Sequence, residues 1–155
     1  MDIIIERLSP SDTGKFTELI QVFEDVFERK NFQMPDETYL EQVLNKEDFF
    51  VFIASKDNTI VGGLTAYILH QYYSKSPLVY IYDLAVKTEY QWQGIGKKLI
   101  AANNTYCRDI GAEVVMLQAE EEDDYAIKFY HSTGATSQRV VHFEYPFTPI
   151  NPSRE

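Results

Sequence analysis

The stretch "YDLAVKTEYQWQGIGKKLI", residues 82–100, predicts the fold, because an apolar run leads into two glycines at the start of a helix pattern. A glycine inside a helix costs about 1 kcal/mol relative to alanine, so we expect Gly94 and Gly96 to permit a close backbone approach. Bare N–H groups at a helix N-terminus bind phosphate. The spacing excludes two common phosphate motifs, since a P-loop requires glycine where Gln91 stands and a dinucleotide fingerprint requires it at Leu99.

The composition indicates one folded domain, which we assign to residues 1–155. A hydrophobic fraction of 45%, with 14% aromatic residues, is typical of a globular chain. No apolar stretch approaches the roughly 20 residues that span a bilayer, and the N-terminus lacks a signal-peptide pattern. Cys107 is the one cysteine, so no internal disulfide can form, and we expect a small buried hydrophobe. These features favour a cytoplasmic protein.

The charge balance limits the classes of partner that the chain can bind. Fourteen Lys and Arg residues stand against 24 Asp and Glu residues, which gives a net charge of −10. Such a chain repels nucleic acid and anionic membranes unless it has a basic patch, and none is visible. A cationic substrate is compatible with this charge, although many proteins are acidic for solubility alone.

Hydrophobic periodicity predicts a mixed α/β domain around a central sheet. Strands are expected over residues 3–7, 49–55, 59–70, 78–86, 113–119 and 139–145. Helices are expected over residues 10–29, just after Pro35, and over residues 94–110 and 123–132. Ser9 is the expected N-cap of the first helix. Gly62 and Gly63 interrupt a strand pattern and predict a bulge or a close approach there.

The glycine turn resembles the acetyl-CoA signature of the GNAT superfamily of N-acetyltransferases, which is Gln or Arg, two residues, Gly, one residue, and Gly or Ala. These positions are Gln91, Gly94 and Gly96. The family's second signature, Ala, Tyr and Gly at intervals of four, is matched by Ala126, Tyr130 and Gly134. The resemblance implies an α/β (α+β) GNAT fold, with a mixed, mostly antiparallel sheet flanked by about four helices. It also implies acetyl-CoA as cosubstrate and a homodimer.

A narrower resemblance connects four short segments with the type I aminoglycoside 3-N-acetyltransferases, the gentamicin acetyltransferases. The segments are "VGGLTAYIL", "VYIYDLAV", "QAEEEDDYAIKFY" and "VHFE". Asp123 stands where many GNAT members have Asn, and this subgroup is also acidic there. The resemblance implies acetylation of the 3-amino group of an aminoglycoside, and hence antibiotic resistance.

The GNAT resemblance also implies which residues hold acetyl-CoA. The CoA pyrophosphate is expected at the turn, which begins at Gln91 and offers the backbone N–H groups of Gln93, Gly94, Ile95, Gly96 and Lys97. The pantetheine arm is expected to pair with the backbone of Leu84, Ala85 and Val86.

Asp83 and Tyr130 are the expected catalytic residues. An alkylammonium has a pKa of about 10.4, so transfer near neutral pH needs a general base. Asp83 is a carboxylate inside an apolar strand, which is costly unless it is paired or exposed at a site; a structural salt bridge is the alternative. The family position of Tyr130 implies the general acid, and the alternative there is a core tyrosine.

Acidic residues are the expected substrate contacts in addition to Asp83. Five consecutive acids repel one another, and a polycationic amine would relieve this; a solvated surface is the alternative. They are Glu120, Glu121, Glu122, Asp123 and Asp124, with Glu144 a weaker candidate. The histidines show no metal-ligand spacing, so we expect no metal.

Two other functions remain open. One is acetylation of another small amine of the polyamine type. The other is a non-catalytic sensor that binds acetyl-CoA, against which the presence of both Asp83 and Tyr130 argues.

Overall fold

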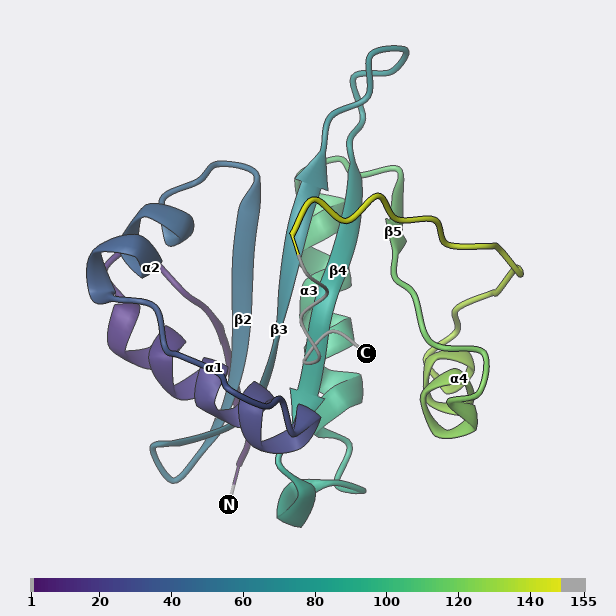
Figure 1. The fold of residues 1–155 in the computed structure, drawn as a ribbon. Helices are drawn as coiled ribbons and strands as arrows, with labels where there is room; N and C mark the ends of the chain where they lie inside the picture. Colours follow the sequence, from purple (N-terminus) through teal and green to yellow (C-terminus); the bar gives the residue numbers. More distant parts are fainter. Residues whose placement is uncertain (1, 149–155) are drawn as a thin grey trace.

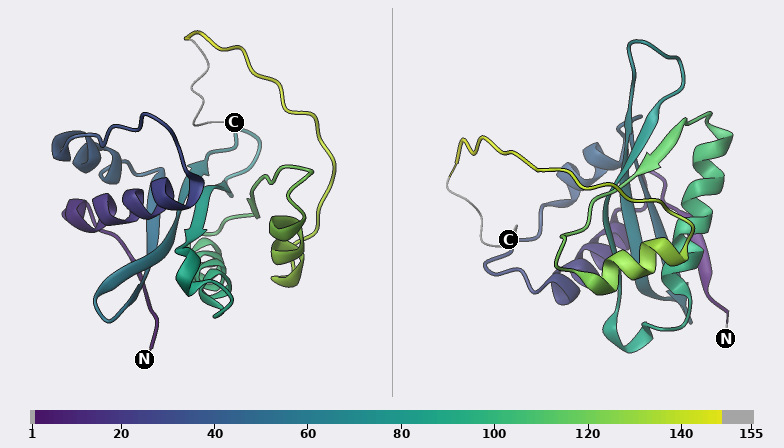
Figure 2. Two further views of the ribbon diagram at one scale, coloured as in Figure 1. Left: turned by 60° about the horizontal axis from the view of Figure 1, so that its bottom comes forward. Right: turned by 90° about the vertical axis from the view of Figure 1, so that its right-hand side faces the viewer.

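The computed structural model describes residues 2–148, which form a five-stranded sheet with helices on both faces (Figures 1 and 2). In chain order the elements are β1 (Ile4–Arg7), α1 (Thr13–Phe27), α2 (Glu37–Leu44), β2 (Phe49–Lys56), β3 (Thr59–Leu69), β4 (Leu78–Val86), the 3-10 helix η1 (Thr88–Tyr90), α3 (Ile95–Asp109), β5 (Val114–Met116) and α4 (Asp124–Ser132). The strands lie in the order β1-β2-β3-β4-β5. Only the β4–β5 pair is parallel, which confirms the expected mixed, mostly antiparallel sheet.

Two apolar cores form because the strands alternate their side chains between the two faces of the sheet. Along β2, one set of side chains packs in the core with α1 and α2, namely Phe49, Val51 and Ile53. The other set packs in the core with α3, namely Phe50, Phe52 and Ala54. Cys107 of α3 is 2% exposed, as expected for a small buried hydrophobe, and burial raises the pKa of its thiol to about 11.

The glycine pair of β3 provides both features considered from the sequence, a bulge and a close approach. The register of β2 and β3 shifts beside Gly62, which is the signature of a bulge. A Cβ atom on Gly63 would lie 2.5 Å from Cδ1 of Leu19 in α1. Gly63 therefore lets α1 approach the sheet closely.

The start of the first helix differs from the prediction. α1 begins at Thr13, and Asp12, not Ser9, is its N-cap residue. The Asp12 carboxylate accepts hydrogen bonds from the Ser9 backbone N–H at 2.7 Å and from the Ser9 hydroxyl at 3.0 Å. These bonds close a turn ahead of the helix, so the helix begins later than residue 10.

The strand expected over residues 139–145 is wrong for the described chain. This segment leaves α4 as an extended stretch outside the sheet (Figure 1). Its alternating apolar residues Val141, Phe143 and Tyr145 are 75%, 81% and 86% exposed. The pattern of a strand is present, but within residues 2–148 no strand pairs with it. No helix in this part of the chain is both long and apolar enough to cross a membrane.

Candidate active site

The edge of β4 next to β5 is open over its second half. β4 and β5 pair only from Leu78 with Val114 to Tyr80 with Met116. The strand expected over residues 113–119 is shorter because the chain turns away after Met116 toward α4 (Figure 1). The backbone of Leu84, Ala85 and Val86 therefore has no β5 partner among the described residues. An extended ligand could pair with this edge as another strand would.

The turn after β4 brings a helix N-terminus to the same edge. Gln91 Nε2 donates to the Val86 carbonyl at 3.1 Å, which ties the turn to the end of β4. Gly94, the N-cap residue of α3, has a φ of 78° and no side-chain cap. Intrahelical bonding begins with Lys98 N–H, which donates to the Gly94 carbonyl at 3.1 Å. The preceding N–H groups of the helix are therefore free to bind an anion. In contrast, Asp side chains cap α2 and α4.

The two glycines of the turn play different parts. A Cβ atom on Gly94 would have nothing within 4 Å, so the space at the helix start is open. A Cβ atom on Gly96 would lie 2.8 Å from Cζ of Phe129 in α4. The sequence predicted that both glycines serve a bound phosphate, whereas the missing Cβ of Gly96 makes room for α4. Gly96 thereby fixes the helix that carries Tyr130.

A groove between α3 and the end of α4 adds positive charge to this region. Its volume is about 370 Å³, and its lining residues are Lys97, Ile100, Ala101, Asn104, Thr105, Arg108 and Thr133. Lys97 lies in the first turn of α3, next to the uncapped helix start, whereas Arg108 lies in the last turn of the helix. A cation beside an uncapped helix start suits a phosphate ligand. The residues present thus fit the expected CoA moiety.

A β-bulge decides where Asp83 points. The register of β3 and β4 shifts so that Tyr82 is an extra residue on β4. Ile81 and Leu84 both lie in the core with α3, although they are an odd number of residues apart, while Ala85 lies in the core with α1. The bulge therefore turns Asp83 away from the α3 core and toward α1.

Asp83 lies beside a partly buried cation, Arg29, whose side chain is 25% exposed. Arg29 Nη2 is 3.7 Å from Asp83 Oδ2, and Arg29 Nη1 is 3.1 Å from Glu24 Oε2. Burial raises the pKa of the Asp83 carboxyl, Arg29 opposes this increase, and Glu24 adds to it; the net direction is upward. The salt bridge considered as an alternative from the sequence is thus present. It leaves Asp83 a stronger base than an exposed aspartate.

Tyr130 reaches the same region from α4. Burial raises the pKa of Tyr130 to about 12, with further contributions from the negative charges of Asp123 and Asp83. The charge of Asp83 therefore opposes ionisation of the Tyr130 phenol. The Tyr130 phenol keeps its proton throughout the neutral pH range.

The five consecutive acids are all exposed but do not act alike. Asp123 caps α4, accepting a hydrogen bond from Ala126 N–H at 3.0 Å. Glu121 lies 3.6 Å from Arg139 in an exposed ion pair. The three remaining exposed acids are Glu120, Glu122 and Asp124.

Glu144 lies on the extended C-terminal segment, where it bonds His142 at 2.9 Å. Within residues 2–148 no group of three His, Cys, Asp or Glu residues could hold a metal ion.

Sequence reasoning missed Glu24 and Arg29. A signal was present, because Glu24 follows Ile20 by one helical turn on the apolar stripe of the first helix, where a carboxylate needs a partner. Two tyrosines near Asp83 were also missed. Burial raises the pKa of Tyr67 and of Tyr80, and the charge of Asp83 contributes to both.

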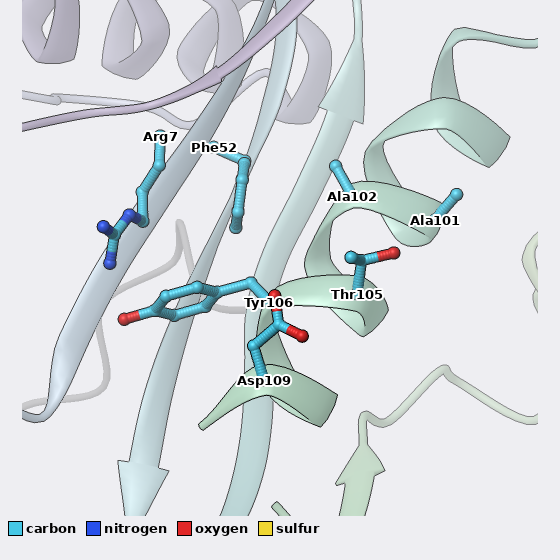
Figure 3. A pocket seen from close by; sticks show the side chains of 7 residues that line it. All are labelled: Arg7, Phe52, Ala101, Ala102, Thr105, Tyr106 and Asp109. Carbon is cyan, nitrogen blue, oxygen red and sulfur yellow. The ribbon is translucent and has the colours of Figure 1, made fainter. Parts of the chain in front are cut away.

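Another hollow, of about 440 Å³, contains none of the expected site residues (Figure 3). It lies between β1, β2 and α3, and its lining residues are Arg7, Phe52, Ala101, Ala102, Thr105, Tyr106 and Asp109. The Arg7 guanidinium stacks over the Tyr106 ring at 4.3 Å from its centroid. We therefore place the candidate site at the open edge of β4.

Comparisons with known proteins show the family of this chain. The sequence profile described as Acetyltransferase (GNAT) family matches residues 16–135. A curated relative from Stenotrophomonas maltophilia, aminoglycoside N(6')-acetyltransferase type 1, is 29% identical over 115 residues, or 71% of this chain and 75% of that protein. The relative is of the N(6') type, so the narrower resemblance to the 3-N enzymes is not confirmed.

Solved structures of other acetyltransferases resemble this chain. An aminoglycoside acetyltransferase from an uncultured soil metagenomic sample, solved with sisomicin, is 52% identical, with a TM-score of 0.92 over 94% of this chain and 97% of that one. Aminoglycoside N-acetyltransferase AAC(6')-Iy in complex with CoA is 20% identical, with a TM-score of 0.77 over 95% and 96% of the two chains. The second likeness shows a shared fold.

Proposed function

Because this chain belongs to the acetyltransferase (GNAT) family, we propose that it transfers the acetyl group of acetyl-CoA to an amino group of an aminoglycoside. The observation that carries the proposal is the arrangement at the open edge of β4. There a half-buried carboxylate, Asp83, lies on the strand that leads to an uncapped helix start, and a protonated phenol, Tyr130, lies in the helix that packs against the first turn of α3. The solved relative at 52% identity, an aminoglycoside acetyltransferase, supports the substrate class.

The names of the relatives favour one position of acetylation. The narrower sequence resemblance implied the 3-amino group, whereas the curated relatives are N(6') enzymes and favour the 6'-amino group. NMR of the product formed from an aminoglycoside with both amino groups tests this choice. An acetyl group on the 6'-nitrogen supports our assignment, and one on the 3-nitrogen overturns it.

The binding of acetyl-CoA, which supplies the acetyl group as a thioester, is assigned to three parts of the site. The backbone N–H groups from Gln93 to Lys97 bind the pyrophosphate, where the open space at Gly94 admits it. Lys97 adds positive charge at the first turn of α3, where the groove begins. The free edge at residues 84–86 orients the pantetheine arm, and Gln91 shapes the turn through its bond to Val86.

The proton transfers are assigned to two atoms of the chain. An Asp83 carboxylate oxygen accepts the proton of the substrate ammonium, directly or through water, and the raised pKa of this carboxyl makes it a better base. Tyr130 Oη, which stays protonated at neutral pH, would donate its proton to the thiolate that departs when the acetyl group moves to the amine.

The three remaining exposed acids, before and at the start of α4, are assigned to substrate attraction. We expect the combined change of Glu120, Glu122 and Asp124 to Gln, Gln and Asn to raise KM for a polycationic amine. The increase should be largest at low salt, since exposed charges are screened beyond about 10 Å at 0.1 M. Steady-state kinetics at two salt concentrations measure it. If KM stays at the wild-type value in low salt, these acids form only a solvated surface.

An assay of CoA thiol release with a panel of amines distinguishes the two other functions, the polyamine-type enzyme and the acetyl-CoA sensor. A polyamine that releases CoA thiol faster than any aminoglycoside would favour the polyamine-type enzyme. Binding of acetyl-CoA without thiol release with any amine would favour the sensor. The raised pKa of Asp83, which suits a base, favours catalysis.

We also propose that the protein is a cytoplasmic homodimer joined through residues 139–147. This segment exposes four alternating large apolar residues, Val141, Phe143, Tyr145 and Phe147. An exposed strand pattern of this kind is a template for pairing with a second chain. Such pairing would supply the neighbour that the predicted strand lacks.

Light scattering tests the dimer. The change of Phe143 and Tyr145 to Ser should convert a two-chain particle into a one-chain particle. Tyr72→Ser is the matched control, because Tyr72 is 97% exposed at a different place, between β3 and β4. A wild-type protein with the mass of one chain at micromolar concentration would contradict the proposal.

A further inference from the structure

A buried carboxylate in α1 lies outside the catalytic assignments above. Glu24 is 7% exposed on the apolar face of the helix. Its Oε2 is 3.1 Å from Arg29 Nη1, while its Oε1 is buried without a hydrogen-bond partner among the described residues. Burying an incompletely paired carboxylate is costly, and an apolar residue would be cheaper at this position. Glu24 therefore has a role beyond packing.

The contacts of Arg29 show what that role is. Glu28 has a φ of 53° and ends α1 in the left-handed conformation, after which the chain presents Arg29 to the helix it has just left. The guanidinium carbon lies 5.0 Å from the centroid of the Phe27 ring. One nitrogen then contacts Glu24 and the other lies 3.7 Å from Asp83 Oδ2. The planar fork of arginine suits this bridge between two carboxylates.

We propose that Glu24 and Arg29 are positioning residues, in which Glu24 anchors the guanidinium and the guanidinium holds Asp83 ionised and oriented for the substrate amine. This inference rests on the proposed function of Asp83 as a base. Without a fixed cation, a carboxyl buried among apolar groups binds a proton more readily and loses the ability to accept another.

The titratable groups that interact electrostatically with Asp83 come from four elements. α1 contributes Glu24 and the adjoining Arg29, β3 contributes Tyr67, β4 contributes Tyr80, and α4 contributes Tyr130. Arg29 is the one cation among them. The tyrosines are neutral near pH 7, because the ordinary pKa of tyrosine is about 10 and theirs are raised further. The protonation of Asp83 near neutral pH is thus governed by burial, Arg29 and Glu24.

The pH profile of kcat/KM tests the inference. With Asp83 as the base, activity is lost as the pH falls through the pKa of this carboxyl. Removal of the guanidinium by Arg29→Gln should move this acid limb upward by about one pH unit, the low end of the effect of a nearby opposite charge. Arg29→Lys should restore part of the shift, since it keeps the charge but not the fork. Lys30→Gln, which removes an exposed charge from the adjacent residue, is the matched control and should keep the wild-type limb.

Arg29→Gln alone leaves Glu24 buried and unpaired, which destabilises the fold. A second variant avoids this problem. The double variant Glu24→Gln/Arg29→Gln replaces the ion pair with two neutral amides. It should fold, as checked by circular dichroism, and should still show an upward shift, because Arg29 affects Asp83 more than Glu24 does.

The outcomes separate the two proposals. An acid limb that stays in place in Arg29→Gln and in the double variant overturns the positioning role, even if Asp83→Asn abolishes the limb. A wild-type rate and profile in Asp83→Asn instead overturns the assignment of Asp83 as the base.

Discussion

Asp83→Asn is expected to lower kcat by about 10²- to 10³-fold near neutral pH, within the usual range for loss of a general base. Asparagine has the shape of aspartate but cannot accept a proton. The structure supports a large effect, because burial raises the pKa of Asp83 and so makes its carboxylate a better base than a solvated one.

The loss should shrink as the pH rises, since the free amine of the substrate increases toward its pKa of about 10 and then needs no base. Measurement of kcat from about pH 6 to about pH 10 shows both effects. The control is Asp25→Asn, which removes an exposed carboxylate from the same helix as Glu24 and should keep the wild-type rate. An Asp83→Asn protein with wild-type kcat at neutral pH would remove Asp83 from the mechanism.

Gly94→Asp is expected to weaken acetyl-CoA binding by about 10²-fold, because like charges brought together cost several kcal/mol. Gly94 has a φ of 78°, and a Cβ atom there meets nothing within 4 Å, so the change adds a carboxylate without a clash. That carboxylate would face the bound phosphates and also accept hydrogen bonds from the free N–H groups of α3.

Gly94→Asn is the matched control, since Asn has the same shape, lacks the charge and tolerates a left-handed backbone. Isothermal titration with acetyl-CoA on both folded variants compares them. Equal affinity in the Asp and Asn variants would show that no anion binds at this helix start.

The parts of the fold predicted most closely from sequence have strong local signals. The run at residues 78–86 is nearly all apolar and bounded by turn residues, and it matches β4 as observed. The helix expected over residues 94–110 matches α3, which ends at Asp109 and is followed by Gly111 with a φ of 80°, as is common for a glycine after a helix. Both signals depend on neighbours within a few positions in the chain.

The parts predicted poorly depend on contacts between distant segments. Residues 139–145 carry the alternation of a strand, but alternation does not say whether an edge is available to pair with. The bulge at Tyr82 moves Asp83 to the other face of the sheet, and no residue of β4 predicts this bulge from the sequence. The sequence therefore predicted Asp83 as a catalytic residue but did not predict its ion pair with Arg29.

In the candidate site, too, features with a local sequence signal were predicted and features that depend on distant contacts were not. The turn from Gln91 to Lys97 was located by its motif, while the separate tasks of its glycines follow from the approach of Phe129 to Gly96. Glu24 could have been flagged as a charge on an apolar stripe. Its partner Arg29 could not, because the left-handed Glu28 that brings it back has no sequence signal of its own.

The measurement that tests the central claim most directly is release of CoA thiol from acetyl-CoA, with sisomicin and a polyamine offered separately to the wild-type protein and to Asp83→Asn. We expect the wild-type protein to release thiol with sisomicin, to release less with the polyamine, and to lose most of this activity in Asp83→Asn. A wild-type protein that binds acetyl-CoA but releases no thiol with either amine would contradict the account.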